Sequence, residues 1–362
     1  MRTFGQIVDE AKGIGSGFDL LRLFAASMVL VSHAYPLTFG SDAIEPVFVL
    51  SHGQMTLGRI AVGLFFSTSG FLVTASLLRS ESILDFGWRR AVRILPALWV
   101  VVAVCALVVG PIFTRLALPA YFSDPGTYHY AFNAIFLTTY PALPGVFGSN
   151  PMGPPVNGSL WTLIYEVGSY VSLSALGFLG LYRWRLGFLI GILALIGVTF
   201  MAPNLLHGRL RPFSELFVYF GIGSLIYLYR QYLWFSAGLA ALAGLCIAAS
   251  LMFGGAMIVV PIALGYIAIW FGFQKVTFKL QGDYSYGVYL WAFPIQQMLE
   301  ASMPGLTPVR NIILALPLAL LAGFLSWNGV EKPALKLKGL ALTHIVPAWK
   351  TTKASIGFGR IG

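Results

Sequence analysis

Long apolar runs follow one another along this chain, separated mostly by short polar connections. A helix of about 20 apolar residues is long enough to cross a hydrocarbon core roughly 30 Å thick. The pattern therefore predicts an all-α fold, a polytopic transmembrane bundle of about ten helices at 18–38, 57–78, 93–112, 159–180, 185–202, 212–230, 233–252, 254–273, 283–301 and 309–330. The junctions near 180–185 and 252–254 are so short that a merged or re-entrant pair stays open.

Composition points the same way, because 57% of the 362 residues are hydrophobic and 10% are charged. Residues 1–13 are polar and charged, so the first apolar run is expected to remain as a membrane helix rather than to be removed as a signal. We expect a single membrane domain over 1–340 and a short basic cytoplasmic tail over 341–362.

Cys105 and Cys246 lie inside apolar runs and are expected to be small buried hydrophobes, with no disulfide or metal framework.

The basic residues predict the orientation of the bundle. With ten helices and a cytoplasmic N-terminus, 18 of the 23 Lys and Arg residues lie on the cytoplasmic side, and five lie on the other: Arg59, Arg115, Arg209, Arg211 and Arg310. The positive-inside rule then places both termini in the cytoplasm and the 113–158 loop outside. Much of the net charge of +10 lies in the cytoplasmic loops and the tail, facing anionic membrane lipids, so it calls for no nucleic-acid partner.

The loop over 113–158 is the longest connection and is rich in Pro, Gly, aromatic and small polar residues. Such a loop favours a lid or a binding wall over a spacer. Interfacial aromatic belts have the same composition as sugar sites. Both interpretations therefore stay open for Tyr128, His129, Tyr130 and Asn133.

Ionisable side chains at bilayer depth cost at least roughly 2.5–3.5 kcal/mol, so those inside the apolar runs are candidate functional residues that need partners. The first run carries Asp19, Arg22 and His33. Eleven positions separate Arg22 from His33, which places them on nearly the same helix face about 16 Å apart along the axis. Arg22 is then expected at the cytoplasmic headgroups and His33 in the outer half of the membrane, although a lone helix histidine is usually a satisfied core residue.

A basic pair opens the third run. Arg90 and Arg93 stand at i and i+3 in GWRRAVRILPALW (87–99), so they point to one side of a helix. Guanidinium groups grip phosphates bidentately, which suits an anionic ligand. Basic residues that snorkel to the interface show the same pattern, so that plainer interpretation stays open.

A carboxylate lies in the fourth run. Glu166 follows Trp161 and Tyr165 in NGSLWTLIYEV (157–167), and we expect it about two turns into the helix. A carboxylate at that depth is expensive unless it meets a cation or an imidazole. His33 on the first helix is the candidate partner.

Six segments, in this order along the chain, resemble those of the acyltransferase-3 family of membrane acyltransferases: DLLRLFAASMVLVSH (19–33), VGLFFSTSGFLV (62–73), WRRAVRILPALW (88–99), NGSLWTLIYEVGSY (157–170), SYGVYLWAFP (285–294) and VEKPALKL (330–337). The resemblance covers residues 19 to about 337. By it, His33 matches the essential helix-one histidine, Arg22 the arginine preceding it, Arg90 and Arg93 the helix-three basic pair, and Glu166 the helix-four carboxylate. Many members have YLWHFP where this chain has YLWAFP, which removes any contribution to proton handling from a histidine at 292.

The resemblance implies a membrane-bound O-acyltransferase of the bacterial inner (cytoplasmic) membrane. Its donor would be cytoplasmic acyl-CoA, most often acetyl-CoA, and no metal is expected. Its acceptor would be a hydroxyl of an extracytoplasmic or lipid-linked carbohydrate, reached across the membrane. His33 and Glu166 are then the catalytic candidates, and the donor-binding candidates are Arg22, Arg90 and Arg93. Candidate acceptor contacts are Trp161, Tyr165 and Asn133.

The residue chemistry is compatible with that reaction. An imidazole with an ordinary pKa near 6.5 can take the proton of a sugar hydroxyl as it attacks the thioester, with a carboxylate stabilising the imidazolium. A covalent acyl-histidine relay stays open. Donors near the oxyanion could come from Ser67, Ser69 and Gly70, although small residues in membrane helices also serve close packing.

Two functions from other classes remain. A carbohydrate or lipid-precursor transporter would also have about ten helices, intramembrane charges and a long outer loop, although its charges would line a path. A non-enzymatic scaffold would need neither His33 nor Glu166. The acceptor sugar, the acyl chain and the oligomeric state are left open by the sequence.

Overall fold

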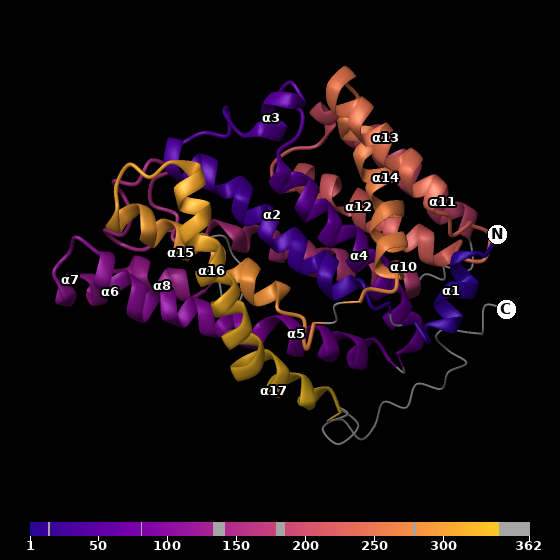
Figure 1. Ribbon diagram of the computed structural model, residues 1–362. Coiled ribbons are helices and arrows are strands. Elements are labelled where there is room, and N and C mark those ends of the chain that lie inside the picture. Colours follow the sequence, from indigo (N-terminus) through magenta and orange to yellow (C-terminus); the bar gives the residue numbers. More distant parts are fainter. Residues whose placement is uncertain (14, 81, 133–141, 179–184, 278–279, 340–362) are drawn as a thin grey trace.

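The computed structural model describes residues 1–339, apart from 14, 81, 133–141, 179–184, 278 and 279 (Figure 1). Over these residues the chain folds into helices, with three isolated β-bridges. The predicted all-α fold is confirmed. The expected basic tail over 341–362 and the candidate Asn133 lie outside the described residues.

Each predicted apolar run corresponds to one long helix. In chain order these helices are α2 (Phe18–Phe39), α4 (Leu57–Arg79), α5 (Ile83–Val104), α10 (Leu163–Phe178), α11 (Arg185–Met201), α12 (Leu210–Leu228), α13 (Ala237–Phe253), α14 (Ala256–Gly272), α15 (Ser285–Ser302) and α16 (Pro308–Ser326). Shorter helices lie between them or at the ends: α1 (Phe4–Glu10), α3 (Pro46–Leu50), α6 (Gly110–Phe113), α7 (Leu118–Ser123), α8 (Pro125–Ala131) and α17 (Lys332–Leu335).

Several helical segments are long and apolar enough to cross a bilayer. By length and composition these are Phe18–Phe39, Leu57–Arg79, Ile83–Phe113 and Pro308–Lys338, and α11, α13 and α14 are shorter apolar helices. The chain is therefore a multi-pass membrane protein. The junction near 252–254 is a tight hairpin between two separate helices, because Gly254 and Gly255 both adopt positive φ, at 104° and 86°.

Two differences from the predicted helix boundaries affect candidate site residues. Helix α5 begins at Ile83 rather than near 93, because Ser82 caps it by accepting the backbone N–H of Asp85 at 3.0 Å. The first turns of α5 carry arginines, so hydropathy alone did not identify these turns as helical. Helix α10 begins at Leu163, after a 3₁₀ turn, η2 (Gly158–Thr162), which places Glu166 in its first turn rather than two turns in.

Helix α4 lies at the centre of the bundle and packs against α2, α12 and α14. Glycines set its approach to α12: a Cβ on Gly70 would lie 1.9 Å from the carbonyl oxygen of Phe220, and one on Gly223 would lie 2.0 Å from that of Ser67. Small residues allow such close backbone contact between membrane helices. Gly70 therefore serves packing.

The chain before α10 is fastened to α15. Asn150 donates from Nδ2 to Oε1 of Gln297 at 2.7 Å, and Gln297 donates to the carbonyl of Pro155 at 2.7 Å. Asn157 donates to the carbonyl of Leu290 at 2.9 Å. These buried amides fix the position of η2 and thus of the first turn of α10.

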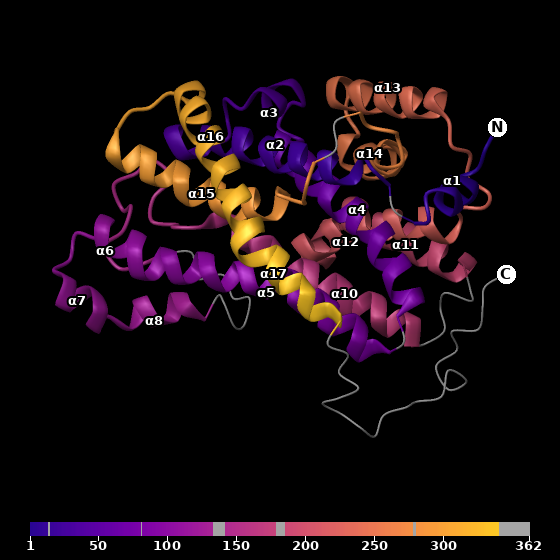
Figure 2. The ribbon, with the colours of Figure 1, turned by 60° about the horizontal axis from the view of Figure 1, so that its bottom comes forward.

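The preceding loop contains α7 and α8, which lie with α6 on the opposite side of the molecule from α11 and α13 (Figure 2). Tyr130 is buried here, and Tyr128 donates its hydroxyl to the carbonyl of Phe122 at 2.7 Å. Cys105 is buried as expected, but the expectation for Cys246 is wrong, because its side chain is exposed. Cys246 follows the exposed Leu242 and Leu245 on α13, a helix apolar on every side.

Candidate active site

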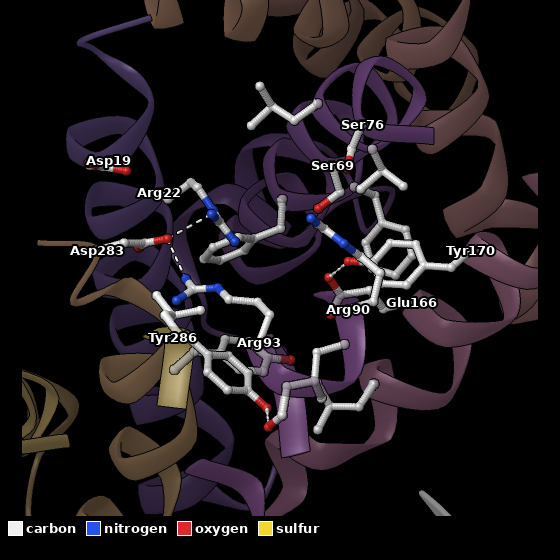
Figure 3. Close-up of a pocket in the computed structure, with 18 of the residues that line it drawn as sticks. Asp19, Arg22, Ser69, Ser76, Arg90, Arg93, Glu166, Tyr170, Asp283 and Tyr286 are labelled. Carbon is white, nitrogen blue, oxygen red and sulfur yellow. Dashed lines mark hydrogen bonds and ion pairs between the residues drawn. The ribbon is translucent and has the colours of Figure 1, made fainter. Parts of the chain in front are cut away.

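A polar cavity of about 490 Å³ opens among α2, α4, α5, α10 and α15 (Figure 3). We call it the basic cavity, because its charged lining residues are Arg22, Arg79, Arg90, Arg93 and Lys338 against Asp19, Glu166 and Asp283. The excess of positive charge attracts an anionic ligand. Three predicted donor-binding residues, Arg22, Arg90 and Arg93, and the predicted catalytic Glu166 all line it.

Asp283 connects two of these arginines. Its Oδ2 accepts Nη1 of Arg22 at 2.7 Å and also accepts Nη2 of Arg93, while its Oδ1 accepts the N–H and hydroxyl of Ser285 at the start of α15. Figure 3 shows Asp283 between the two guanidinium groups. The carboxylate therefore fixes Arg22 of α2 and Arg93 of α5 in one place.

Glu331 adds a second carboxylate behind Arg93. It belongs to the π-helical turn η4 (Trp327–Glu331) after α16, and its side chain is 2% exposed. Its Oε2 accepts Nη1 of Arg93 at 3.2 Å, and its Oε1 accepts the hydroxyl of Ser326 at 3.0 Å. Arg93 thus joins two buried carboxylates, whose positions depend on it.

Arg90 and Glu166 lie together on the other side of the basic cavity (Figure 3). Glu166 accepts the hydroxyl of Tyr170, one turn further along α10. Arg90 lies over the ring of Phe86 at 5.9 Å, and its buried Nε has no hydrogen-bond partner among the described residues. A guanidinium so placed can bind a further anion.

A second cavity, of about 440 Å³, contains His33. We call it the histidine cavity, and its other polar or aromatic lining residues include Ser32, Asp42, Arg59, Trp161, Glu215, Tyr219 and Tyr289. The ring of His33 packs edge to face on Phe293 at 5.3 Å, and its buried Nδ1 finds no hydrogen-bond partner in the described part of the chain. Buried polar atoms are usually satisfied, so this nitrogen marks a candidate functional group.

The structure separates the two residues that the sequence paired. His33 lines the histidine cavity and Glu166 the basic cavity, and no hydrogen bond joins them among the described residues. Helix α2 passes both cavities along one face, with Asp19 and Arg22 at the basic cavity and His33 at the other. Ala292 is 1% exposed and lies next to Phe293, the contact of His33.

Of the remaining candidate residues, some line a cavity and others pack behind its wall. Trp161 lines the histidine cavity and is 39% exposed. Tyr165 packs on Trp161 with ring centroids 5.6 Å apart and lines neither cavity, so it supports the wall from behind. Ser69 lines the basic cavity, whereas Ser67 is buried and its hydroxyl has no hydrogen-bond partner within the described segments.

Sequence reasoning missed several charged residues of both cavities. Asp283 is the first residue of the run 283–301, and Glu331, which bonds to Arg93 but lines neither cavity, directly follows the run 309–330, in a chain with 13 acidic residues in all. Position beside an apolar run was the available signal. At the histidine cavity Arg59 forms an ion pair with Glu215, which Arg211 also approaches at 3.5 Å. Among the described residues, no group of three or more potential metal ligands is present.

In this helical membrane bundle, α2 passes a cavity with an excess of positive charge and a cavity with a histidine whose Nδ1 has no hydrogen-bond partner among the described residues, an arrangement suited to a membrane-embedded group-transfer enzyme. Residues 16–328 match the model of the acyltransferase domain of the acyltransferase-3 family. The chain belongs to this family and is a membrane O-acyltransferase.

Curated relatives extend over nearly the whole chain. It is 31% identical over 332 residues to an O-acetyl transferase of Shigella phage Sf6, covering 87% of this chain and 94% of the relative. It is 28% identical over 375 aligned positions to Nodulation protein 10 of Rhizobium leguminosarum bv. viciae, covering 91% of this chain and 96% of the relative. No solved structure matches the chain significantly.

Proposed function

We propose that this protein transfers an acetyl group from cytoplasmic acetyl-CoA to a hydroxyl of a carbohydrate at the outer face of a bacterial inner membrane. The observation that carries the proposal is the pair of cavities along α2, one with the arginines and one with His33. The name of the Shigella phage relative, O-acetyl transferase, supports acetyl as the acyl group. The positive-inside rule supports cytoplasmic termini and a cytoplasmic basic cavity.

The donor would bind in the basic cavity. CoA carries several phosphates, and the cations of this cavity outnumber its carboxylates. Arg22 and Arg93 are already held by Asp283, and among the described residues the buried Nε atoms of Arg22 and Arg90 have no hydrogen-bond partner. The donor therefore enters a preorganised group of guanidinium side chains and orders few new side chains on binding.

The acceptor would bind in the histidine cavity. The exposed indole of Trp161 offers an apolar face to a sugar ring, and Asp42, Arg59 and Glu215 offer hydrogen bonds to its hydroxyls. Carbohydrate sites combine such aromatic surfaces with a few polar groups. A free or lipid-linked glycan reaching this cavity would present a hydroxyl to His33.

The chemistry would take place beside His33. As the hydroxyl oxygen attacks the thioester carbonyl, His33 takes its proton, and the proton passes to the departing CoA thiolate as the carbon–sulfur bond breaks. Nδ1 of His33 is buried and bonds to no described group, so no described hydrogen bond there holds the imidazole away from this role. Glu166 would act on the donor side, where it is held by Tyr170 near Arg90.

Label from acetyl-CoA is expected in alkali-labile carbohydrate esters of the native host's membranes. The measurement uses inside-out vesicles from strains with and without this gene, supplied with acetyl-labelled acetyl-CoA. Ester label that depends on the gene supports the enzyme. Sugar movement across the vesicle membrane without ester label would support a transporter and contradict the proposal.

Arg90→Ala is expected to raise the KM for acetyl-CoA by about 10- to 100-fold, since a hydrogen bond to a charged group contributes about 1.5–3 kcal/mol. Arg89→Ala is the matched control, because Arg89 pairs with Asp85 and lies outside the cavity lining. Steady-state kinetics in the same vesicles measure both variants. Equal donor KM values for Arg90→Ala and Arg89→Ala would contradict donor binding by Arg90.

A further inference from the structure

The basic cavity and the histidine cavity meet at a thin partition. Of the residues that line the two cavities, Val62 and Tyr289 are common to both. Val62 lies in the second turn of α4 and Tyr289 in the second turn of α15. Any group that passes from the arginines to His33 within the protein must therefore pass these two side chains.

Tyr289 is held firmly in this partition. Its hydroxyl lies 2.7 Å from Oγ1 of Thr162 and donates to the carbonyl of Ser159 at 2.9 Å, so two bonds tie α15 to η2. Its ring packs edge to face against Phe65 at 5.7 Å and is 7% exposed. Displacing the ring would break buried hydrogen bonds, which are expensive to leave unmade.

Val62 is equally constrained. It is 9% exposed and β-branched, and such side chains have one strongly preferred rotamer in a helix. The next residue, Gly63, touches the ring of Tyr219 so closely that a Cβ there would lie 2.5 Å from Cε1. Val62 therefore lies in a closely packed segment of α4, where the size of the side chain at 62 limits the space between the two cavities.

The partition lies between the donor's anchor and the proposed base. Tyr289 is four residues, about 6 Å, along α15 from Ser285, the first residue of that helix and a hydrogen-bond partner of Asp283, whereas His33 is about 16 Å along α2 from Arg22. Asp283 and Arg22 are in direct contact, so the distances along α15 and along α2 are counted from nearly the same level of the bundle. A thioester extending from the arginines reaches Val62 and Tyr289 before it reaches His33.

We propose that Val62 and Tyr289 form the aperture through which the acyl group reaches His33, and that Val62 restricts that group to acetyl. The inference rests on the proposed function. The acyl group passes Val62 and Tyr289 while it is still bound to CoA sulfur, and beside His33 its carbonyl carbon loses that bond and gains one to the acceptor oxygen, whose proton passes through His33 to the departing thiolate. A longer acyl chain must fit beside the two methyl groups of Val62, which makes Val62 a specificity-determining residue.

Val62→Ala is expected to raise the ratio of kcat/KM for propionyl-CoA over acetyl-CoA by at least about 10-fold, since a hydrophobic pocket discriminates one methylene by about 10- to 200-fold. Val62→Thr keeps the side-chain shape and should keep the parental ratio. Val73→Ala is the matched control: it removes the same two methyl groups from the basic cavity, three turns further along α4. It should also keep the parental ratio.

The assay supplies inside-out vesicles of the native host with acetyl-CoA and propionyl-CoA together and identifies the alkali-released acyl groups by mass spectrometry. Thermal unfolding of each purified variant confirms that it is folded. The aperture would be overturned if folded Val62→Ala kept the parental propionyl-to-acetyl ratio, or if Val73→Ala changed that ratio equally. Neither result would contradict the proposed acetyl transfer. Absence of gene-dependent transfer from either donor by the parental protein would overturn the proposed function and the aperture together.

Discussion

Replacing His33 with alanine is expected to lower kcat by about 10²- to 10⁴-fold, the usual contribution of a general base. The donor's affinity should change little, because the arginines line a different cavity. The fold should also survive, since Nδ1 of His33 bonds to no described group and its ring packs edge to face on Phe293 alone among the described aromatic rings. Steady-state kinetics with acetyl-CoA and thermal unfolding of the purified variant provide the measurements.

The matched control for this variant is His207→Ala. His207 is exposed and lines neither cavity, so its replacement should leave kcat at the parental value. If His33→Ala transfers acetyl at nearly the parental rate, His33 is a packed polar residue and the proposed base is wrong. Binding of acetyl-CoA to His33→Ala separates this result from a loss of the donor site.

Glu166→Gln distinguishes two roles for the carboxylate. If Glu166 orients His33, as the sequence suggested, this variant should lose kcat to the same extent as His33→Ala. Its location in the basic cavity, bonded to Tyr170, instead predicts that the donor's KM changes more than kcat. The two roles predict different kinetic effects, so kcat and the donor's KM of Glu166→Gln distinguish them without any assumption about motion between the two cavities.

The membrane helices could be predicted because hydropathy is a local property of the chain. Each apolar run became a helix, and the main boundary error arose at α5, where Arg89 and Arg90 interrupt the apolar pattern of a helix that already began at Ile83. The arginine group could also be predicted, since Arg90 and Arg93 are one turn apart. Local spacing fixes such relationships within a helix.

Contacts between helices could not be predicted in the same way. The sequence gives no relative height for α2 and α10, so it could not show that His33 and Glu166 line different cavities. Asp283 is 261 positions from Arg22, and nothing local to either residue indicates the ion pair. The partition was hidden for the same reason, because Val62 looks like any other apolar residue of its run.

Arg93→Ala is expected to destabilise the protein by about 3–5 kcal/mol, the usual effect of removing one partner of a buried ion pair. Arg93 pairs with both Asp283 and Glu331, whose side chains are 11% and 2% exposed. Asp283 keeps Arg22 as a partner, but Glu331 keeps only the hydroxyl of Ser326 among its described contacts. The measurement is thermal unfolding of the purified variant in detergent.

A second substitution distinguishes the effect of the missing ion pair from that of the missing side-chain packing. Arg93→Ala combined with Glu331→Gln removes the stranded carboxylate and should recover most of the stability, while donor affinity stays low because the guanidinium is absent. Arg89→Ala, which breaks a pair that is 44% exposed on the arginine side, should cost under about 1 kcal/mol. If Arg93→Ala unfolds at the parental temperature, the two carboxylates do not depend on Arg93, and the basic cavity is not held together by this network.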